Sequence, residues 1–339
     1  MTRLLTWALG IAVAIATASA ASAGTLQTVQ ARGYLQCGVN TGLPGFGYTN
    51  SSGEWAGFDV DYCRAVAAAV FGDPTKVKFT PLDATQRFTA LQNREVDVLI
   101  RNTTWTMSRD TTLGLSFAGV NYYDGQGFMV HKELGVKSLK ELSGATVCVQ
   151  NGTDTQINMA DYFRSHNLSY KPLSFEKLPD AIAAYDGGRC DAWTTDASGL
   201  AATRLQLKNP DDDIILPEII SKEPLGPVVR QGDDQWFNVV KWTHYALLDA
   251  EELGITKANV DEMKKTSTSP ETRRLLGVEG NFGKGVGLSN DWAYNVIKTL
   301  GNYGEIFDRN LGAASPLKIK RGLNALWTDG GLQYGMPVL

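Results

Sequence analysis

The chain has 339 residues, of which 43% are hydrophobic and 20% are charged, and its formal net charge is −4. This composition is typical of a globular protein and excludes a disordered or collagen-like chain. A mildly acidic chain without basic blocks is not suited to nucleic acid, whose binding needs clustered cations. The three histidines share no short spacing, so we expect no histidine-rich metal site, while a site made of carboxylates alone stays open.

Residues 1–23 have the pattern of a secretory signal peptide. Arg3 supplies the positive start, residues 4–18 form an apolar run, and Ala-Ser-Ala occurs at 18–20 and again at 21–23. We expect cleavage after Ala23 and a mature protein outside the cytoplasm. A membrane anchor is the weaker alternative, because the run is shorter than the ~20 apolar residues that a span needs.

The four cysteines fit an exported protein, in which an even number suggests disulfides. Four thiols allow three pairings. We favour Cys37–Cys63 and Cys148–Cys190, because each pair closes within one predicted lobe. Free buried thiols remain the alternative.

Predicted strands and helices alternate in two similar units. Apolar residues recur at three- to four-residue spacing over 59–71, which predicts a helix that ends before Gly72. The first unit also has expected strands at 34–40, 77–80 and 96–100, a helix at 84–93, a polar loop at 102–109 and an extended segment at 113–128. The second has strands at 145–150, 173–175, 190–194 and 214–216, and helices at 138–142, 154–165, 179–186 and 197–205. Five helices follow at 235–253, 259–265, 270–275, 290–300 and 304–310.

Such βαβ units predict an α/β fold with mixed, mainly parallel sheets flanked by helices. We expect two lobes, the first formed by 24–128 together with 229–339 and the second by 129–228. The chain is expected to cross between them near 127–131 and near 222–229, where two prolines favour an extended linker. Two lobes joined by paired crossings are suited to closing around a ligand.

No motif indicates catalysis. The sequence has no GxSxG, no GxxxxGK[ST], and no GxGxxG after the first strand. Paired carboxylates at Asp59 and Asp61, and at 211–213, are explained by a helix start and a solvated turn. We therefore predict a protein that is not an enzyme, with no catalytic residue, cofactor or metal.

Three segments offer groups that suit a small zwitterion. The loop 102–109 follows a strand at the sheet edge where open α/β sheets bind ligands, and its Arg109 can grip a carboxylate with two hydrogen bonds. Residues 152–154 precede a helix whose first amides suit an anion. Asp196 follows another strand and can accept from an ammonium. Together they predict a trap for an α-amino acid, although singly Arg109 is equally explained as a surface cation and Asp196 as a helix cap.

These motifs, in this order, resemble the type II periplasmic amino-acid-binding proteins, the solute receptors of polar-amino-acid ABC importers. They are GFDVD at 57–61, NTTWTMSR at 102–109, GTD at 152–154 and CDAWTTD at 190–196. The similarity runs from about Gly33 to the end of the chain, and LQCGVNTGLPGF and DATQRFTAL resemble the broad-specificity branch, the general L-amino-acid-binding periplasmic proteins. The resemblance implies a two-lobed fold, L-amino acids as ligands, permease subunits as partners and a monomer.

The resemblance also implies roles for single residues. Arg109 stands where the α-carboxylate is clamped, and Asp196 stands where the ammonium is bound. Thr104 matches a hydroxyl that touches either group, and Asn102 matches a backbone carbonyl that accepts from the ammonium. Trp105, in the same loop, offers a planar ring to the ligand.

Further positions concern the second lobe and the ligand's side chain. Thr153 and Asp154 match a helix start that donates amides to the carboxylate. The Asp154 charge is a departure, since it disfavours a ligand carboxylate unless it points away. Arg87 matches an arginine that helps to bind the side-chain carboxylate in the acidic-amino-acid branch. The loop at 40–46 lacks the aspartate of the basic-amino-acid branch, which argues against lysine and arginine as ligands.

The predicted function is an extracytoplasmic receptor that binds L-amino acids, acidic and polar ones included, by hinge closure and delivers them to an ABC importer. One alternative is a receptor specific for acidic amino acids. Another is a dehydratase-type enzyme on the same scaffold, for which Asp154 and Glu176 are the loose candidates for an acid. A chemoreceptor partner with the same ligand chemistry is a third.

Overall fold

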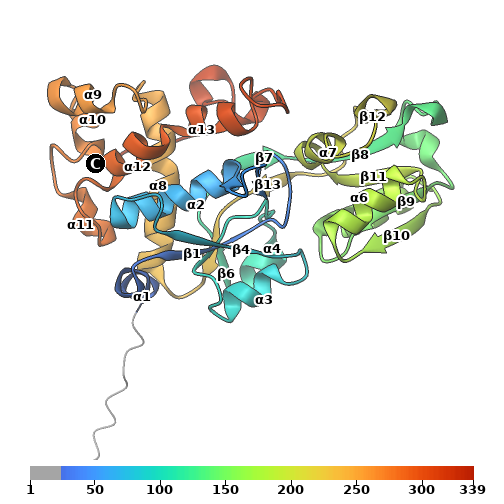
Figure 1. Ribbon diagram of the computed structural model, residues 1–339, viewed down its shortest axis with the longest axis horizontal. Coiled ribbons are helices and arrows are strands. Elements are labelled where there is room, and N and C mark those ends of the chain that lie inside the picture. The colour runs from blue at the N-terminus through green and yellow to red at the C-terminus, as the bar shows by residue number, and fades with distance from the viewer. Residues whose placement is uncertain (1–23) are drawn as a thin grey trace, which may run out of the picture.

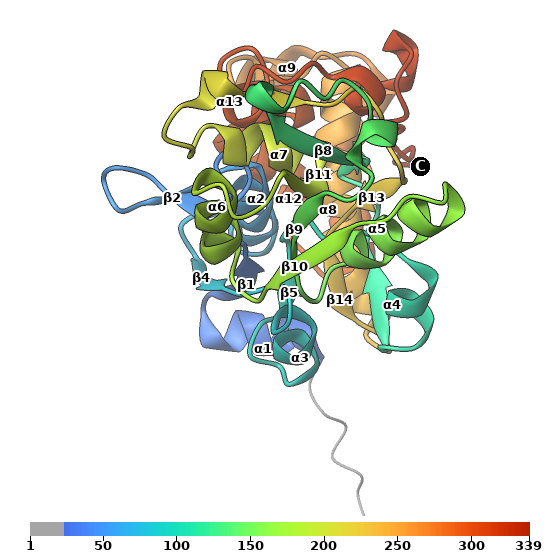
Figure 2. The same ribbon diagram turned by 90° about the vertical axis from the view of Figure 1, so that its right-hand side faces the viewer.

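The computed structural model describes residues 24–339, so the predicted signal peptide lies outside the described residues. Two α/β lobes lie side by side and are joined by a narrow two-stranded ribbon (Figure 1). Seen at 90° to that view, the second lobe lies in front of the first (Figure 2). No described helix is long and apolar enough to cross a membrane.

The first lobe is built on a five-stranded sheet with the order β4-β1-β5-β14-β6. Its strands are β1 (Leu35–Val39), β4 (Val77–Pro81), β5 (Val98–Leu99), β6 (Leu115–Phe117) and β14 (Val228–Arg230). β1 runs parallel to β4 and β5, whereas β14 is antiparallel to β5 and β6. The small hairpin β2 (Tyr48–Thr49) and β3 (Trp55–Ala56) lies beside this sheet.

The second lobe has the same number of strands, in the order β10-β9-β11-β8-β12. They are β8 (Gln126–His131), β9 (Thr146–Gln150), β10 (Lys171–Phe175), β11 (Ala192–Asp196) and β12 (Asp213–Ile215). β9 is parallel to β10 and β11, and β8 is antiparallel to β11 and β12. Its helices are α5 (Asp154–Ser165), α6 (Leu178–Asp186) and α7 (Ala197–Arg204). Mixed, mainly parallel sheets flanked by helices are confirmed.

The helices of the first lobe come from both ends of the chain (Figure 1). They are α1 (Thr25–Arg32), α2 (Phe58–Phe71), α3 (Arg87–Gln92), α4 (Met107–Thr111), α8 (Asp234–Glu252), α9 (Val260–Thr266), α10 (Pro270–Leu275), α11 (Phe282–Val286), α12 (Trp292–Leu300) and α13 (Tyr303–Asn310). The predicted helix over 59–71 is confirmed and ends at Gly72, whose φ of 70° suits glycine. It is buried nearly all round, because both the sheet and the C-terminal helices cover it.

Three short helices, α1, α4 and α11, were not predicted. α1 buries only Leu26 and Val29, so its hydrophobic pattern is too weak to recognise. α4 lies at the end of the segment predicted as a polar loop. The expected helix at 138–142 is a 3-10 helix (Leu139–Leu142); the other 3-10 turns are Lys132–Leu134, Pro210–Asp212, Gly322–Asn324 and Trp327–Asp329.

The crossing ribbon consists of β7 (Tyr122–Asp124) and β13 (Glu223–Leu225), which are antiparallel with Asp124 opposite Glu223. The sequence placed the first crossing at 127–131, and this placement is wrong. Those residues belong to β8, in the second sheet, where they are almost entirely buried. Continuous burial is typical of a central strand rather than of a linker. The second crossing lies within 222–229, as expected.

The C-terminal segment is attached to this ribbon. The Asn324 side chain accepts a hydrogen bond from the Tyr123 amide at 2.6 Å and donates one to the Tyr123 carbonyl at 3.0 Å. The hydroxyl of Tyr303 on α13 donates to the carbonyl of Asn121 at 2.9 Å. The end of the chain therefore holds the backbone of β7 on the side away from β13.

Both predicted disulfides are present. Cys37 on β1 is bonded to Cys63 on α2, with Cα atoms 6.1 Å apart, and Cys148 on β9 is bonded to Cys190, with Cα atoms 5.6 Å apart. No described cysteine is free. Each bond joins a central strand to a neighbouring segment within one lobe.

Replacing both cysteines of one pair by alanine is expected to lower the free energy of unfolding by about 3–4 kcal/mol, because closed segments of 26 and 42 residues restrict the unfolded chain. Denaturant unfolding of the double variants measures this loss. A loss below about 1 kcal/mol for both pairs would show that the bonds do not stabilise the lobes.

Candidate functional site

A cavity lies between the lobes, where the carboxyl ends of strands from both sheets meet. It is small, with a volume of about 30 Å³. The first lobe contributes Asn40, Leu43, Arg87, Arg101, Asn102 and Thr104; the second contributes Gln150, Thr153, Asp154, Thr155, Leu178, Thr195, Asp196, Gly199 and Thr203. Six of the eight residues predicted from the sequence to bind ligand are among them.

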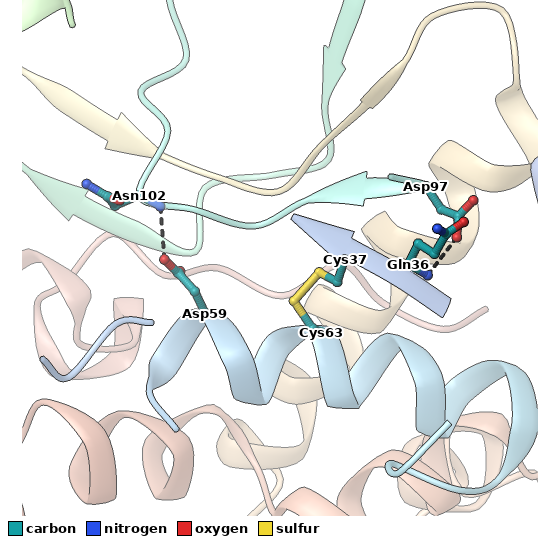
Figure 3. The surroundings of a disulfide bond; sticks show 6 residues. All are labelled: Gln36, Cys37, Asp59, Cys63, Asp97 and Asn102. Carbon is teal, nitrogen blue, oxygen red and sulfur yellow. Dashed lines mark hydrogen bonds between the residues drawn. A yellow bond between two sulfur atoms is a disulfide. The ribbon is translucent and has the colours of Figure 1, made fainter. Parts of the chain in front are cut away.

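The loop that begins at Asn102 is held in place by the start of α2. Asn102 has a φ of 31°, which is unusual for a residue other than glycine. Its amide donates to Asp59 Oδ2 at 2.9 Å, as Figure 3 shows, and its side-chain oxygen accepts from Asn40 at 2.9 Å. Asp59 makes no side-chain cap for its own helix. The same figure shows the Cys37–Cys63 bond anchoring α2 to β1, so one rigid unit sets the position of the loop.

Arg109 makes an ion pair across the cleft. Its Nη2 lies 3.1 Å from Asp154 Oδ1, and its Nη1 donates to Asp154 Oδ2 at 3.3 Å and to the Thr104 carbonyl at 2.8 Å. Burial by itself opposes ionisation of Asp154, but the Arg109 guanidinium holds the pKa of that carboxyl below its usual value. The aspartate points toward Arg109 and not away from it. Its carboxylate therefore occupies the donors that the sequence assigned to a ligand carboxylate, and Arg109 itself does not line the cavity.

Asp196 ends β11 and is 7% exposed. It stands at the N-cap position of α7, but its side chain makes no cap hydrogen bond, and no side-chain hydrogen bond to its carboxylate is formed within residues 24–339. Burial, followed by the charges of Asp124, Glu223 and Asp154, raises its pKa well above the usual value. A buried carboxylate of this kind is stabilised by a cation, so the site offers an acceptor for an ammonium.

The crossing ribbon also reaches the site, through Glu223. Its carboxylate accepts from Thr104 at 2.6 Å in the first lobe and from Asn158 at 2.8 Å on α5 in the second. Burial raises the pKa of Glu223 to about 7, and the nearby Asp154 charge adds to this rise. Thr104 therefore already donates its hydroxyl proton to the ribbon, and only its oxygen lone pairs remain for another partner.

Two residues that the sequence suggested for the site, Trp105 and Glu176, do not line the cavity. Trp105 does not line the cavity: it is 39% exposed and its ring stacks on Phe117 at 5.5 Å between centroids. Successive residues of an extended loop point to opposite sides, so a buried Thr104 leaves Trp105 facing outward. Glu176, one candidate for an enzymatic acid, is exposed and also lies outside the cavity lining.

Sequence reasoning missed Arg101 and Glu223. Arg101 directly follows the buried strand residues 98–100. The rule that ligands bind at the ends of strands, which indicated Asn102, therefore applies to Arg101 as well. Glu223 is a charged residue within the predicted second crossing. Nothing in the local sequence indicates that its side chain turns toward the cleft.

The family model for bacterial extracellular solute-binding proteins, family 3, matches residues 35–261. The chain belongs to this family. Of the described residues, 24–34 and 262–339 lie outside the family model, and the latter form most of the C-terminal helices and the segment that contacts β7.

Similarity to individual proteins covers nearly the whole chain. The general L-amino acid-binding periplasmic protein AapJ of Rhizobium johnstonii is 66% identical over 99% of both chains. The glutamate/glutamine/aspartate/asparagine-binding protein BztA of Rhodobacter capsulatus is 57% identical over 96% of this chain and 97% of its own. A solved structure of a periplasmic binding protein of an ABC transporter from Brucella ovis, with glutathione bound, is 65% identical and has a TM-score of 0.92, covering 94% of this chain and all of its own.

Replacing Asp154 by asparagine is expected to strengthen amino-acid binding by about tenfold, because a ligand carboxylate no longer competes with an internal carboxylate for Arg109. Titration calorimetry measures the affinity. Because the ion pair between the lobes is lost, small-angle scattering should show a larger radius of gyration for the ligand-stripped variant than for the ligand-stripped wild type. Asp161→Asn, on the exposed side of the same helix, is the matched control. Unchanged or weaker binding in Asp154→Asn would contradict competition between the two carboxylates.

Burial raises the pKa of Asp59 to about 7, so the folded protein holds a proton there that the unfolded chain releases above pH 4. The resulting stability is present at low pH and is lost as pH rises through about 7. When the pH is raised from 5 to 8, the free energy of unfolding of the wild type is expected to fall. The fall should be roughly 2–3 kcal/mol smaller in Asp59→Asn, which has no carboxyl group to titrate at this position. Because Asp124, Glu223 and Asp249 also titrate in this window, the difference between the two proteins in urea unfolding is the readout. Parallel curves would show that Asp59 is ionised throughout.

Proposed function

We propose that this protein is an extracytoplasmic receptor that binds L-amino acids between its lobes and delivers them to the membrane permease of an ABC importer. The observation that carries the proposal is the pairing of opposite charges from opposite lobes. Asp196, whose carboxylate has no donor among residues 24–339, lies on the second lobe, and Arg87 and Arg101 lie on the first. A zwitterion satisfies both only when the lobes are closed, so its binding energy drives closure.

The relatives support this ligand class and a broad specificity. AapJ is a general L-amino acid-binding protein, and BztA binds glutamate, glutamine, aspartate and asparagine. The Brucella ovis protein was solved with glutathione, which suggests that the ligand range extends beyond free amino acids. We also propose export by residues 1–23, a periplasmic location, action as a monomer and no catalytic activity.

The proposed division of roles follows the contacts. Asp196 receives the α-ammonium, and the Asn102 carbonyl assists. Arg109 and the amides of Thr153 and Asp154 bind the α-carboxylate after the Asp154 side chain has been displaced. Each charge-assisted hydrogen bond contributes roughly 1.5–3 kcal/mol to the binding free energy. The ligand favours the closed form over the open form by the difference between its affinities for the two.

A thermal-shift screen of the mature protein, refolded to remove carried-over ligand, tests the proposal. A ligand that binds only the folded state raises the melting temperature. We expect shifts from many L-amino acids and from glutathione, and none from amines without a carboxylate or keto acids without an ammonium. Shifts from glutamate and aspartate alone would narrow the function to an acidic-amino-acid receptor. No shift from any amino acid would reject the proposal and direct attention to turnover of cyclic dehydratase substrates.

In the same preparation, Arg109→Ala is expected to weaken amino-acid binding by about a hundredfold or more, since the ligand carboxylate loses its guanidinium and Asp154 is left unpaired. Arg164→Ala, whose side chain is exposed on α5, is the control and should bind like the wild type. A loss of less than about fivefold for Arg109→Ala would contradict its assignment to the α-carboxylate.

A further inference from the structure

Two aspartates lie at the start of α7, where the crossing ribbon enters the second lobe (Figure 1). Asp196 is the residue directly before the helix, at its N-cap position, and Asp124 is the last residue of the ribbon strand β7. Aspartate is among the residues that most often cap a helix through their side chains. From its position alone, Asp196 is therefore expected to accept a hydrogen bond from one of the first amides of α7.

The start of α7 is capped from the ribbon instead. Asp124 Oδ1 accepts from the Gly125 amide at 2.9 Å and from the Ser198 amide at 3.4 Å, and its Oδ2 accepts from the Ser198 hydroxyl. The Ala197 amide donates to the Gly125 carbonyl at 2.8 Å. The first two amides of α7 therefore have their acceptors at the end of the ribbon, and the helix's own N-cap side chain makes no cap hydrogen bond.

The charges favour the same division between the two carboxylates. Burial raises the pKa of Asp196 well above its usual value, and among the neighbouring charges that of Asp124 adds most to this rise. Burial also raises the pKa of Asp124, to about 6, but the hydrogen bonds from Ser198 and Gly125 offset part of the effect. Asp196 thus keeps free oxygens and a poorly compensated charge, and a buried carboxylate in this state gains most from an ammonium.

We propose, on the basis of the function proposed above, that Asp124 is a positioning residue for ammonium binding, because it caps α7 in place of Asp196 and leaves the Asp196 carboxylate free for the ligand. Asp196 lines the cavity between the lobes, whereas Asp124 does not. Asp124 therefore acts through Asp196 and not by contact with the ligand. Since it belongs to the ribbon, it also fixes the ammonium-binding end of α7 to the segment that connects the lobes.

A purely structural role for Asp124 would use the same hydrogen bonds, but it predicts a different outcome when they are lost. If Asp124 only stabilises the start of α7, its removal lowers the melting temperature and leaves Asp196 where it is. If Asp124 is a positioning residue, its removal lets Asp196 turn to the free amide of Ser198, so that the amide competes with the ligand's ammonium for the same carboxylate.

Titration calorimetry of the refolded protein with L-glutamine, whose side chain is neutral, tests the proposal. We expect Asp124→Ala to weaken binding about tenfold, whereas Asp124→Asn, which keeps an acceptor for the Ser198 amide, should stay within about threefold of the wild type. Asp233→Ala is the matched control. Asp233 caps α8 in the first lobe, accepting from the Trp236 amide at 3.0 Å, and lies outside the cavity lining. Its loss should lower the melting temperature without changing the affinity.

A crystal structure of ligand-free Asp124→Ala gives a reading that a structural role would not move. We expect the Asp196 carboxylate to accept a hydrogen bond from the amide of Ser198 or Gly199. An unmoved Asp196, an unchanged affinity in Asp124→Ala, or an equal loss in Asp124→Asn would overturn the proposal.

Ser198→Ala removes the hydroxyl that donates to Asp124 and decides the question should Asp124→Ala fail to fold, which circular dichroism reports. It should weaken L-glutamine binding in the same direction by about threefold, and an unchanged affinity would contradict the proposal. Failure of the underlying receptor function looks different, because the wild type would then bind no L-amino acid.

Discussion

The cleft contains more buried charge than the chain itself can pair. Carboxylates of the second lobe and guanidiniums of the first are brought to the facing edges of two sheets, and the one ion pair across the gap among residues 24–339 joins Arg109 and Asp154. The remaining groups, Asp196 on one side and Arg87 and Arg101 on the other, line the cavity and form no ion pair within the described residues. Because charges removed from water are stable only with partners, this imbalance favours a charged ligand in the cleft.

The supporting structure of the first lobe explains how these charges are held in place without relaxing toward each other. Asp59 fixes the amide of Asn102 from the start of α2, and α2 is joined to β1 by a disulfide. At the start of β1, Asp97 accepts a hydrogen bond from the Gln36 amide at 2.7 Å (Figure 3). Asp97 is also paired with Arg32, and these contacts secure the other end of the strand. A preorganised site of this kind spends little ligand-binding energy on ordering its own side chains.

Much of this organisation was predictable because it depends on local pattern. The helix at 59–71, the two disulfides and the polar residues after the strands follow from periodicity, cysteine spacing and the rule that ligands bind at strand ends. The first crossing was not predictable, because residues 126–131 are apolar enough for either a buried strand or a connection, and only pairing with β11 and β12 decides. The direction of the Asp154 side chain was likewise undecided, since it depends on Arg109 approaching from another lobe. Trp105 was misplaced because its sequence position does not reveal to which side of the loop its ring points.

The attachment of Asn324 to Tyr123 has a consequence for the whole molecule. Because one side-chain amide holds both backbone groups of a ribbon residue 201 positions away, the ribbon cannot rotate freely. Either the final turn of the chain moves with it, or two hydrogen bonds break together. Since the apparent affinity of a receptor depends on the fraction of molecules able to close, a change in these two hydrogen bonds would alter ligand affinity without altering the cleft.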